Sequence, residues 1–278
     1  MTEEPASLSD DPLPVTADAE LVKCWRCGKF VDQLVTKCPS CLAKLRDEVV
    51  GTSRRRDPSA ASSGSDLLIQ MLKFYSVMLV VSIVQGFVAA IQGLQPGVET
   101  LVFIGIAEFI DTIIVIVAWN SISECQQPTP SEPEDSRSGL WWWLLPVLGI
   151  LLAINIGYHH VLRTCFQVPL IEDQLTHDPR LLPWWVLVIC VQPAVVEELF
   201  FRQIAFRAIR TTVSLRATII VTSAMFGMAH LGSPLSIPIL CLIGLALGYF
   251  RTSRSGLWLP IVLHFLHNLC ILGVQWWI

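Results

Sequence analysis

Charged residues are scarce in this sequence. Of its 278 residues only 15% are Asp, Glu, Lys or Arg, whereas 53% are hydrophobic, and the mean hydropathy is +0.58. Soluble domains carry about 25% charged residues. The shortage therefore argues against a soluble chain and indicates a membrane protein. Nothing in the composition points to a nucleic-acid partner.

The first residues also lack the basic segment and apolar run of a cleavable signal peptide, so we expect none. Residues 1–20 are acidic and rich in Pro, Ser and Asp. They contain too few apolar groups to pack, and we expect a disordered tail. Targeting would then fall to the first transmembrane helix.

Four of the nine cysteines form two C-x2-C pairs, and the other five show no pairing pattern. The two pairs are Cys24 with Cys27 and Cys38 with Cys41. Four such thiolates on two tight turns suit tetrahedral zinc, whereas two disulfides would need an oxidising compartment. Because four cysteines leave no open position on the metal, we predict a structural zinc ribbon over residues 21–48. It could also bind a cytoplasmic partner.

Residues 49–66 are rich in Ser, Gly and Arg, and they contain the run Arg54-Arg55-Arg56. This composition predicts a flexible basic linker. Its plain role is a solvated spacer, and its basic residues can also be attracted to anionic headgroups, by about 1 kcal/mol each.

The remainder, residues 67–278, is a series of apolar runs, and a membrane-spanning helix needs about 20 residues. We predict an all-α, polytopic transmembrane helix bundle of about seven spans. The sixth is short, so one pair of spans could be kinked or partly re-entrant. The predicted spans are 67–94, 98–122, 140–162, 183–210, 215–231, 236–250 and 257–277.

Basic residues in the loops indicate the orientation. If the zinc segment is cytoplasmic, the opposite side holds only Arg163 and Arg180, while the other loop arginines are cytoplasmic. The requirement for reduced thiols favours the same placement. We therefore expect an integral membrane protein with a cytoplasmic N-terminus.

Two carboxylates and a guanidinium interrupt the fourth span, in the stretch Glu197-Glu198-Leu199-Phe200-Phe201-Arg202. A charge at the bilayer centre costs about 2.5 kcal/mol or more and usually has a function. Glu198 and Arg202, four residues apart, can instead form a plain ion pair at a helix end. Glu197 has no such partner in this stretch.

Other polar residues lie at a similar depth on later spans. At 1.5 Å per residue, Glu197 lies about 20 Å from the cytoplasmic end of its helix, and His230 and Asn268 lie about 21 Å from theirs. His264 and Asn268 share a helix face because they are four residues apart. His267 does not share this helix face, and we expect it to lie beside the site. The sequence does not decide whether Glu108 and Asp111 take part.

Such a group can hydrolyse a peptide bond. A carboxylate and an imidazole can activate one water molecule, while an imidazole N–H and an amide N–H can stabilise an oxyanion. We see no Ser or Cys nucleophile with a base at helical spacing, so we favour direct attack by water. Glu and His also bind zinc, and a zinc-dependent mechanism is the alternative.

Three motifs on separate helices resemble, in order, those of the CPBP family of intramembrane proteases, which includes the CAAX prenyl endopeptidases and bacteriocin-processing enzymes. The resemblance covers about residues 140–278 and leaves the zinc ribbon outside. The motifs are Glu197-Glu198-x3-Arg202, Phe226-x3-His230 and His264-x3-Asn268.

The resemblance implies a role for each matching residue. Glu197 and His230 would activate the water, His264 and Asn268 would form the oxyanion site, and Glu198 with Arg202 would support them. It favours a glutamate-type protease with no metal at the catalytic site. We expect a membrane-associated peptide or protein substrate, with or without a prenyl group, and a prokaryotic plasma membrane.

The competing function is a membrane adaptor without enzyme activity. In that case the zinc ribbon recruits a cytoplasmic partner, and the buried polar groups only specify helix packing. A transporter that uses Glu and His as a proton relay is a weaker alternative, because we see no internal repeat.

Overall fold

A computed structural model describes residues 21–23, 29–32, 35, 38–39, 58–92, 97–122, 139–167, 178–253 and 255–277. The chain divides into two units, Met1–Asp57 and Pro58–Ile278. In the first unit, β1 (Leu21–Lys23) pairs antiparallel with β2 (Phe30–Asp32), and Val22 lies opposite Val31.

The second unit is a bundle of helices, which confirms the predicted fold class. Its first helices are α1 (Pro58–Gln92), α2 (Val98–Ser121) and the 3₁₀ turn η1 (Leu140–Trp143), which leads into α4 (Leu144–Phe166). α1 begins at Pro58, inside the segment predicted to be a flexible linker. Proline is favoured in the first turn of a helix because the missing N–H would have no partner there.

The fourth predicted span runs from Leu182 to Arg210 but is not a regular α-helix. It consists of α5 (Leu182–Trp185), the π-helical segment η3 (Val186–Val191), α6 (Gln192–Glu198), a second π-helical segment η4 (Leu199–Ala205) and α7 (Phe206–Arg210). The short α6, which carries Glu197 and Glu198, is therefore flanked by two wide turns.

The last helices are α8 (Leu215–Met228), the turn η5 (Pro234–Ser236) with α9 (Ile237–Phe250), and α10 (Trp258–Trp277). Among the described residues, five helices are long and apolar enough to cross a membrane. α8 and α9 have 14 residues each, and about 20 are needed. Among the described residues these two complete the seven helices expected, and the sixth is short, as predicted.

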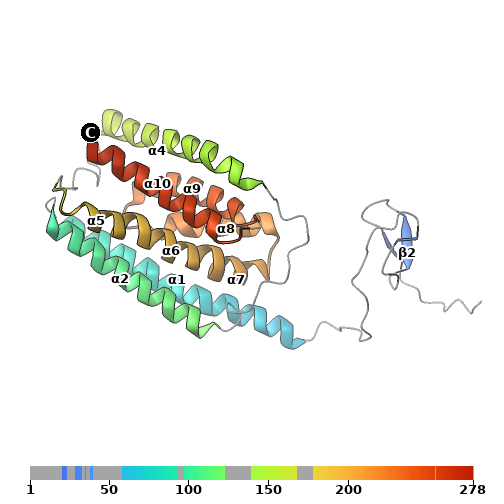
Figure 1. Cartoon of the computed structure of the whole chain (residues 1–278). Coiled ribbons are helices and arrows are strands. Elements are labelled where there is room, and N and C mark those ends of the chain that lie inside the picture. The colour runs from blue at the N-terminus through green and yellow to red at the C-terminus, as the bar shows by residue number, and fades with distance from the viewer. Residues whose placement is uncertain are drawn as a thin grey trace, which may run out of the picture. The chain divides into compact units, whose positions relative to one another are not determined.

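α10 lies in the middle of the bundle (Figure 1). It contacts α4 on one side and η3 and α6 on another, and it also contacts α9. α1 and α2 lie side by side along the fourth span. α10 therefore brings His264, His267 and Asn268 within reach of both α4 and the carboxylates of α6.

Small residues bring α8 and α9 close together. A Cβ on Gly244 of α9 would lie 3.0 Å from Ser223 Cα, and one on Gly248 would lie 3.1 Å from Ile219 Cγ2. The buried hydroxyl groups of α8 need no partner on α9, because Thr222 and Ser223 donate to carbonyl groups of their own helix. Close approach of small residues is a usual way for helices to pack in lipid.

Candidate active site

The ion pair predicted between Glu198 and Arg202 is present and fully buried. Arg202 Nε lies 3.1 Å from Glu198 Oε2, and both side chains have 0% exposure. The two groups attract each other electrostatically, but they lack the alignment of a hydrogen bond. Arg202 Nη2 also donates to the carbonyl oxygen of Gly244 on α9 at 3.2 Å. The pair therefore fixes α6 against α9 at the depth of the site.

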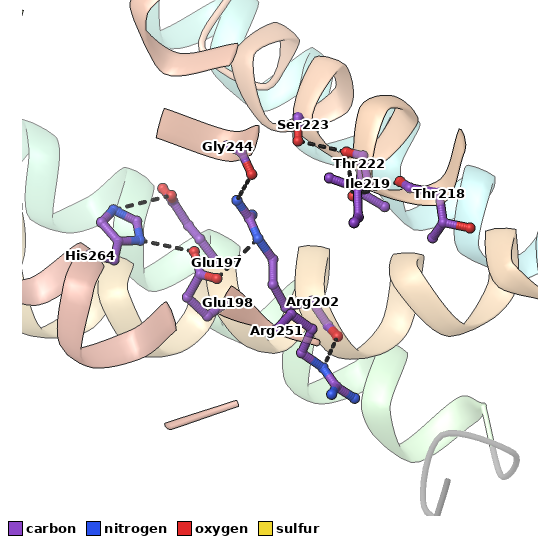
Figure 2. Close-up of polar contacts among 10 residues, drawn as sticks. All are labelled: Glu197, Glu198, Arg202, Thr218, Ile219, Thr222, Ser223, Gly244, Arg251 and His264. Atoms are coloured by element: carbon purple, nitrogen blue, oxygen red, sulfur yellow. Dashed lines mark hydrogen bonds and ion pairs between the residues drawn. The ribbon is translucent and has the colours of Figure 1, made fainter. Parts of the chain in front are cut away.

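His264 lies between the two glutamates (Figure 2). Its Nδ1 is 3.0 Å from Glu198 Oε1, and its Nε2 is 4.0 Å from Glu197 Oε2. A carboxylate can only accept, so Nδ1 donates to Glu198. This hydrogen bond turns Nε2 toward Glu197. Glu198 therefore supports His264 as well as Arg202.

His230 approaches Glu197 from the turn after α8. Its Nδ1 donates to the carbonyl oxygen of Phe226 at 3.0 Å, which leaves Nε2 directed at Glu197 Oε1, 3.7 Å away. That distance is too long for a direct hydrogen bond, but a water molecule lying beside the two atoms can contact both. Glu197 Oε2 is buried and accepts no hydrogen bond from the described residues. The Glu197 carboxylate thus faces the Nε2 atoms of two imidazoles.

The ring of Phe226 joins these groups. It is fully buried and lies 5.4 Å from the ring of His230 and 5.7 Å from that of His264, centroid to centroid. The guanidinium carbon of Arg202 lies 4.6 Å from its centre, a cation–π distance. Phe226 therefore fixes both imidazoles and the buried cation from one side.

α1 holds the turn that carries His230. Ser82 Oγ accepts a hydrogen bond from the Gly232 N–H at 3.0 Å, and Tyr75 donates to the Met225 carbonyl oxygen at 2.9 Å. A Cβ on Gly86 would lie 2.5 Å from Gly232 Cα, so only glycine fits there. The position of His230 thus depends on a helix outside the three motifs.

Asn268 lies one turn beyond His264, but its hydrogen bonds go elsewhere. Its Nδ2 donates to the Ile189 carbonyl oxygen in η3 at 2.9 Å, and its Oδ1 is 3.3 Å from His267 Nδ1. His267 Nε2 is 3.3 Å from Asn155 Nδ2 on α4. The structure therefore brings Glu197, His230 and His264 together directly, whereas Asn268 is tied to His267 and to the fourth span.

α2 contributes acidic groups to the neighbourhood of the site. Asp111 is close enough to His230 and to Glu197 for their charges to interact, and Glu108 interacts with Glu197 in the same way. Gln192 Nε2 joins α6 to α2 by donating to the Glu108 carbonyl oxygen at 2.8 Å. The sequence left the place of Glu108 and Asp111 open, and the structure puts both beside the site.

Among the residues that the structure describes, no group of three or more His, Cys, Asp or Glu side chains is arranged to hold a metal ion. Cys24, Cys27 and Cys41 lie outside the described residues, and Cys38 is buried. The zinc ribbon stays a prediction.

Sequence reasoning missed Asn155, Ser82 and the contacts of Phe226. Asn155 had a signal, because a lone amide within an apolar span is costly and usually has a purpose. Ser82 had none, since a serine in a helix can satisfy its hydroxyl group on its own backbone. Phe226 was quoted only as part of a motif, and its central position depends on how three helices pack.

Residues 179–270 match the family model described as type II CAAX prenyl endopeptidase Rce1-like. The match includes all three motifs and confirms the resemblance expected from them. Together with the membrane-capable helices, this match supports an intramembrane protease. Neither the curated proteins nor the solved structures gave a match.

Proposed function

We propose that this protein is an intramembrane endopeptidase in which Glu197 and His230 activate a water molecule for attack on a peptide bond. One observation carries the proposal: the Glu197 carboxylate faces two imidazole Nε2 atoms, at 3.7 and 4.0 Å, in a bundle of membrane-capable helices. A water molecule beside the pair of Glu197 and His230 would contact both a carboxylate and a ring nitrogen, and either can accept its proton.

The reaction balances with these groups alone. Glu197 takes a proton from the water, and the hydroxide oxygen bonds to the carbonyl carbon of the peptide. The negative charge then moves to the carbonyl oxygen. When the C–N bond breaks, the proton held by Glu197 passes to the leaving nitrogen, and Glu197 is again a carboxylate.

The developing oxyanion would be stabilised from α10. Asn268 has two Nδ2 hydrogens, and Ile189 takes one of them. His264 can donate from Nε2 when that nitrogen carries a proton. Losing one such donor typically lowers kcat by about 10²- to 10³-fold.

We propose a membrane-associated substrate that carries a prenyl group near its C-terminus. The description of the family model and the apolar surroundings of the site support this substrate class. The N-terminal unit would lie in the cytoplasm, its four cysteines would hold a structural zinc ion, and the membrane would be a prokaryotic plasma membrane. A cytoplasmic partner of the ribbon is part of the same proposal.

The test is cleavage of a farnesylated CAAX peptide by the full chain in detergent micelles. Glu197→Gln and His230→Ala should each abolish cleavage while the protein still inserts and folds. Glu99→Gln is the matched control, because Glu99 is an exposed carboxylate in the first turn of α2. Full activity in either site variant would disprove the mechanism.

A second measurement separates the substrate from the reaction. Membrane peptides that accumulate uncut in cells carrying Glu197→Ala are compared with those in wild-type cells. Accumulation of peptides without a prenyl group would retain the protease and reject the prenylated substrate. A phenotype that disappears on deletion of residues 1–50 but survives Glu197→Ala would instead support the adaptor.

Measuring the zinc content of the purified protein tests where metal is bound. In wild-type protein we expect one zinc ion per chain, lost on replacing Cys24 and Cys27 with Ser. A variant that lacks all four ribbon cysteines, the two pairs named above, should keep its activity without bound metal. Stoichiometric metal in that variant would favour the zinc-dependent mechanism.

A further inference from the structure

The carboxamide of Asn268 is held at both ends. Its Nδ2 is 2.9 Å from the Ile189 carbonyl oxygen, and its Oδ1 is 3.3 Å from His267 Nδ1. A carbonyl oxygen only accepts, so the amide nitrogen must face Ile189 and the amide oxygen must face His267. His267 therefore donates from Nδ1.

The same logic fixes the next link. A neutral His267 that is protonated on Nδ1 has a lone pair on Nε2, and Asn155 Nδ2 lies 3.3 Å from it. Asn155 is 7% exposed and His267 is 3% exposed. Asn155 Oδ1 is buried without a hydrogen-bond partner among the described residues. A buried polar atom left unsatisfied needs an explanation. Here the hydrogen bond from Nδ2 to His267 sets the orientation of the Asn155 amide, and Oδ1 is left without a partner as a result.

Pro193 leaves the Ile189 carbonyl oxygen, the acceptor for Asn268 Nδ2, without an α-helical donor. In an α-helix the carbonyl group of Ile189 would accept from the N–H of residue 193, but that residue is Pro193, which has no N–H. The π-helical segment η3 lies at this point. The Ile189 carbonyl oxygen accepts from Asn268 Nδ2 here.

We infer that Asn155, His267 and the Ile189 carbonyl group form a clamp that fixes the orientation of the Asn268 carboxamide. The clamp leaves one Nδ2 hydrogen of Asn268 for the substrate oxyanion and keeps Oδ1 away from it. Without the clamp the amide can turn over and place Oδ1 against the developing negative charge. Asn155 and His267 are then positioning residues. This inference rests on the proposed function, because it gives Asn268 the oxyanion role.

Substitutions at His267 test the inference. Asparagine places an amide nitrogen where Nδ1 lies, so His267→Asn keeps the donor to Asn268. Glutamine and leucine do not. We expect His267→Gln and His267→Leu to lower kcat by about 10- to 100-fold with little change in KM, the size of effect known for residues that orient metal ligands. His267→Asn should retain most of kcat.

A double-mutant cycle separates positioning from general damage. In an Asn268→Ala background the clamp has nothing to orient, so adding His267→Leu should lower kcat no further. His159→Leu is the control, because His159 is on the same helix as Asn155 and bonds to the Asn155 backbone carbonyl oxygen, not to its side chain. Equal losses in both backgrounds, or equal activity of the Asn and Gln variants, would overturn the inference.

A readout independent of activity keeps the inference testable if the farnesylated peptide is not cut. In ¹⁵N-histidine-labelled protein, the signals that vanish in His267→Asn belong to His267. Solid-state NMR should show a neutral ring protonated on Nδ1 in wild type, and a mixture of tautomers in Asn155→Leu. A ring protonated on Nε2 alone would reject the clamp and leave the protease proposal standing.

Discussion

Replacing Arg202 with Met should destabilise the protein strongly. Removing one partner of a buried ion pair typically costs about 3–5 kcal/mol, because the other charge is left uncompensated. Both side chains here have 0% exposure. His264 Nδ1 would still donate to the remaining Glu198 carboxylate, so we expect a loss near the lower end of that range. About 3 kcal/mol changes the ratio of folded to unfolded protein by roughly 10²-fold.

Companion variants show whether charge burial is the cause. In the double variant Glu198→Gln with Arg202→Met neither partner of the pair leaves an uncompensated charge, and the glutamine oxygen still accepts from His264. It should be clearly more stable than Arg202→Met alone. Arg180→Met is the matched control, because Arg180 forms an exposed pair with Asp178 at 2.9 Å, and an exposed pair contributes little.

The assay is reversible unfolding in mixed micelles, followed by tryptophan fluorescence as the denaturing detergent is increased. The reasoning fails if Arg202→Met unfolds at the wild-type midpoint, or if the double variant is as unstable as the single one. Arg202→Lys gives a further check. Lysine keeps the charge but lacks the planar group that contacts both Gly244 and the ring of Phe226, so we expect an intermediate loss.

Two further predictions concern backbone contacts beside the site. Gly232→Ala should reduce activity at least ten-fold, because its Cβ would lie 2.7 Å from the Ser82 carbonyl oxygen and displace the turn that carries His230. Gly157→Ala is the control, since nothing lies within 4 Å of a Cβ there; equal activity of the two would contradict the contact. Pro193→Ala restores an N–H that can compete for the Ile189 carbonyl oxygen, so kcat should fall while the unfolding midpoint stays or rises. A lower midpoint with unchanged kcat would show that the proline matters only for folding.

The residues of the site could be predicted because each is costly in an apolar span. Glu197, His230 and His264 stood out by type and estimated depth, and the structure brings the two imidazoles to 3.7 and 4.0 Å from the Glu197 carboxylate. Their catalytic roles stay predictions. The hydrogen bond between Glu198 and His264 was not foreseen, since it depends on how α6 and α10 are rotated.

The helix boundaries were predicted less well than the helices. The runs 215–231 and 236–250 were taken as spans from their apolar composition, but α8 and α9 end after 14 residues each. The π-helical segments could not be recognised from the spacing of apolar residues, because most faces of the fourth span are apolar and a change of period is not visible there. Pro193 was a readable clue to η3, whereas η4 contains no proline or glycine.

The two wide turns on either side of α6 limit how the length of this span can change. A π-helical turn holds one residue more than the α-helical turn it replaces. Deleting one residue within Val186–Val191 would therefore let η3 close as an α-helix, whereas a change of length within α6 would rotate Glu197 by about 100° relative to one of its flanks. In η4 the Arg202 carbonyl oxygen accepts from Arg251 Nε at 2.8 Å, so this turn is tied to a second helix end as well. The fourth span should therefore tolerate no change of length within α6. In alignments of related chains, gaps are expected to avoid residues 192–198 and to fall, where they occur, in the two π-helical turns.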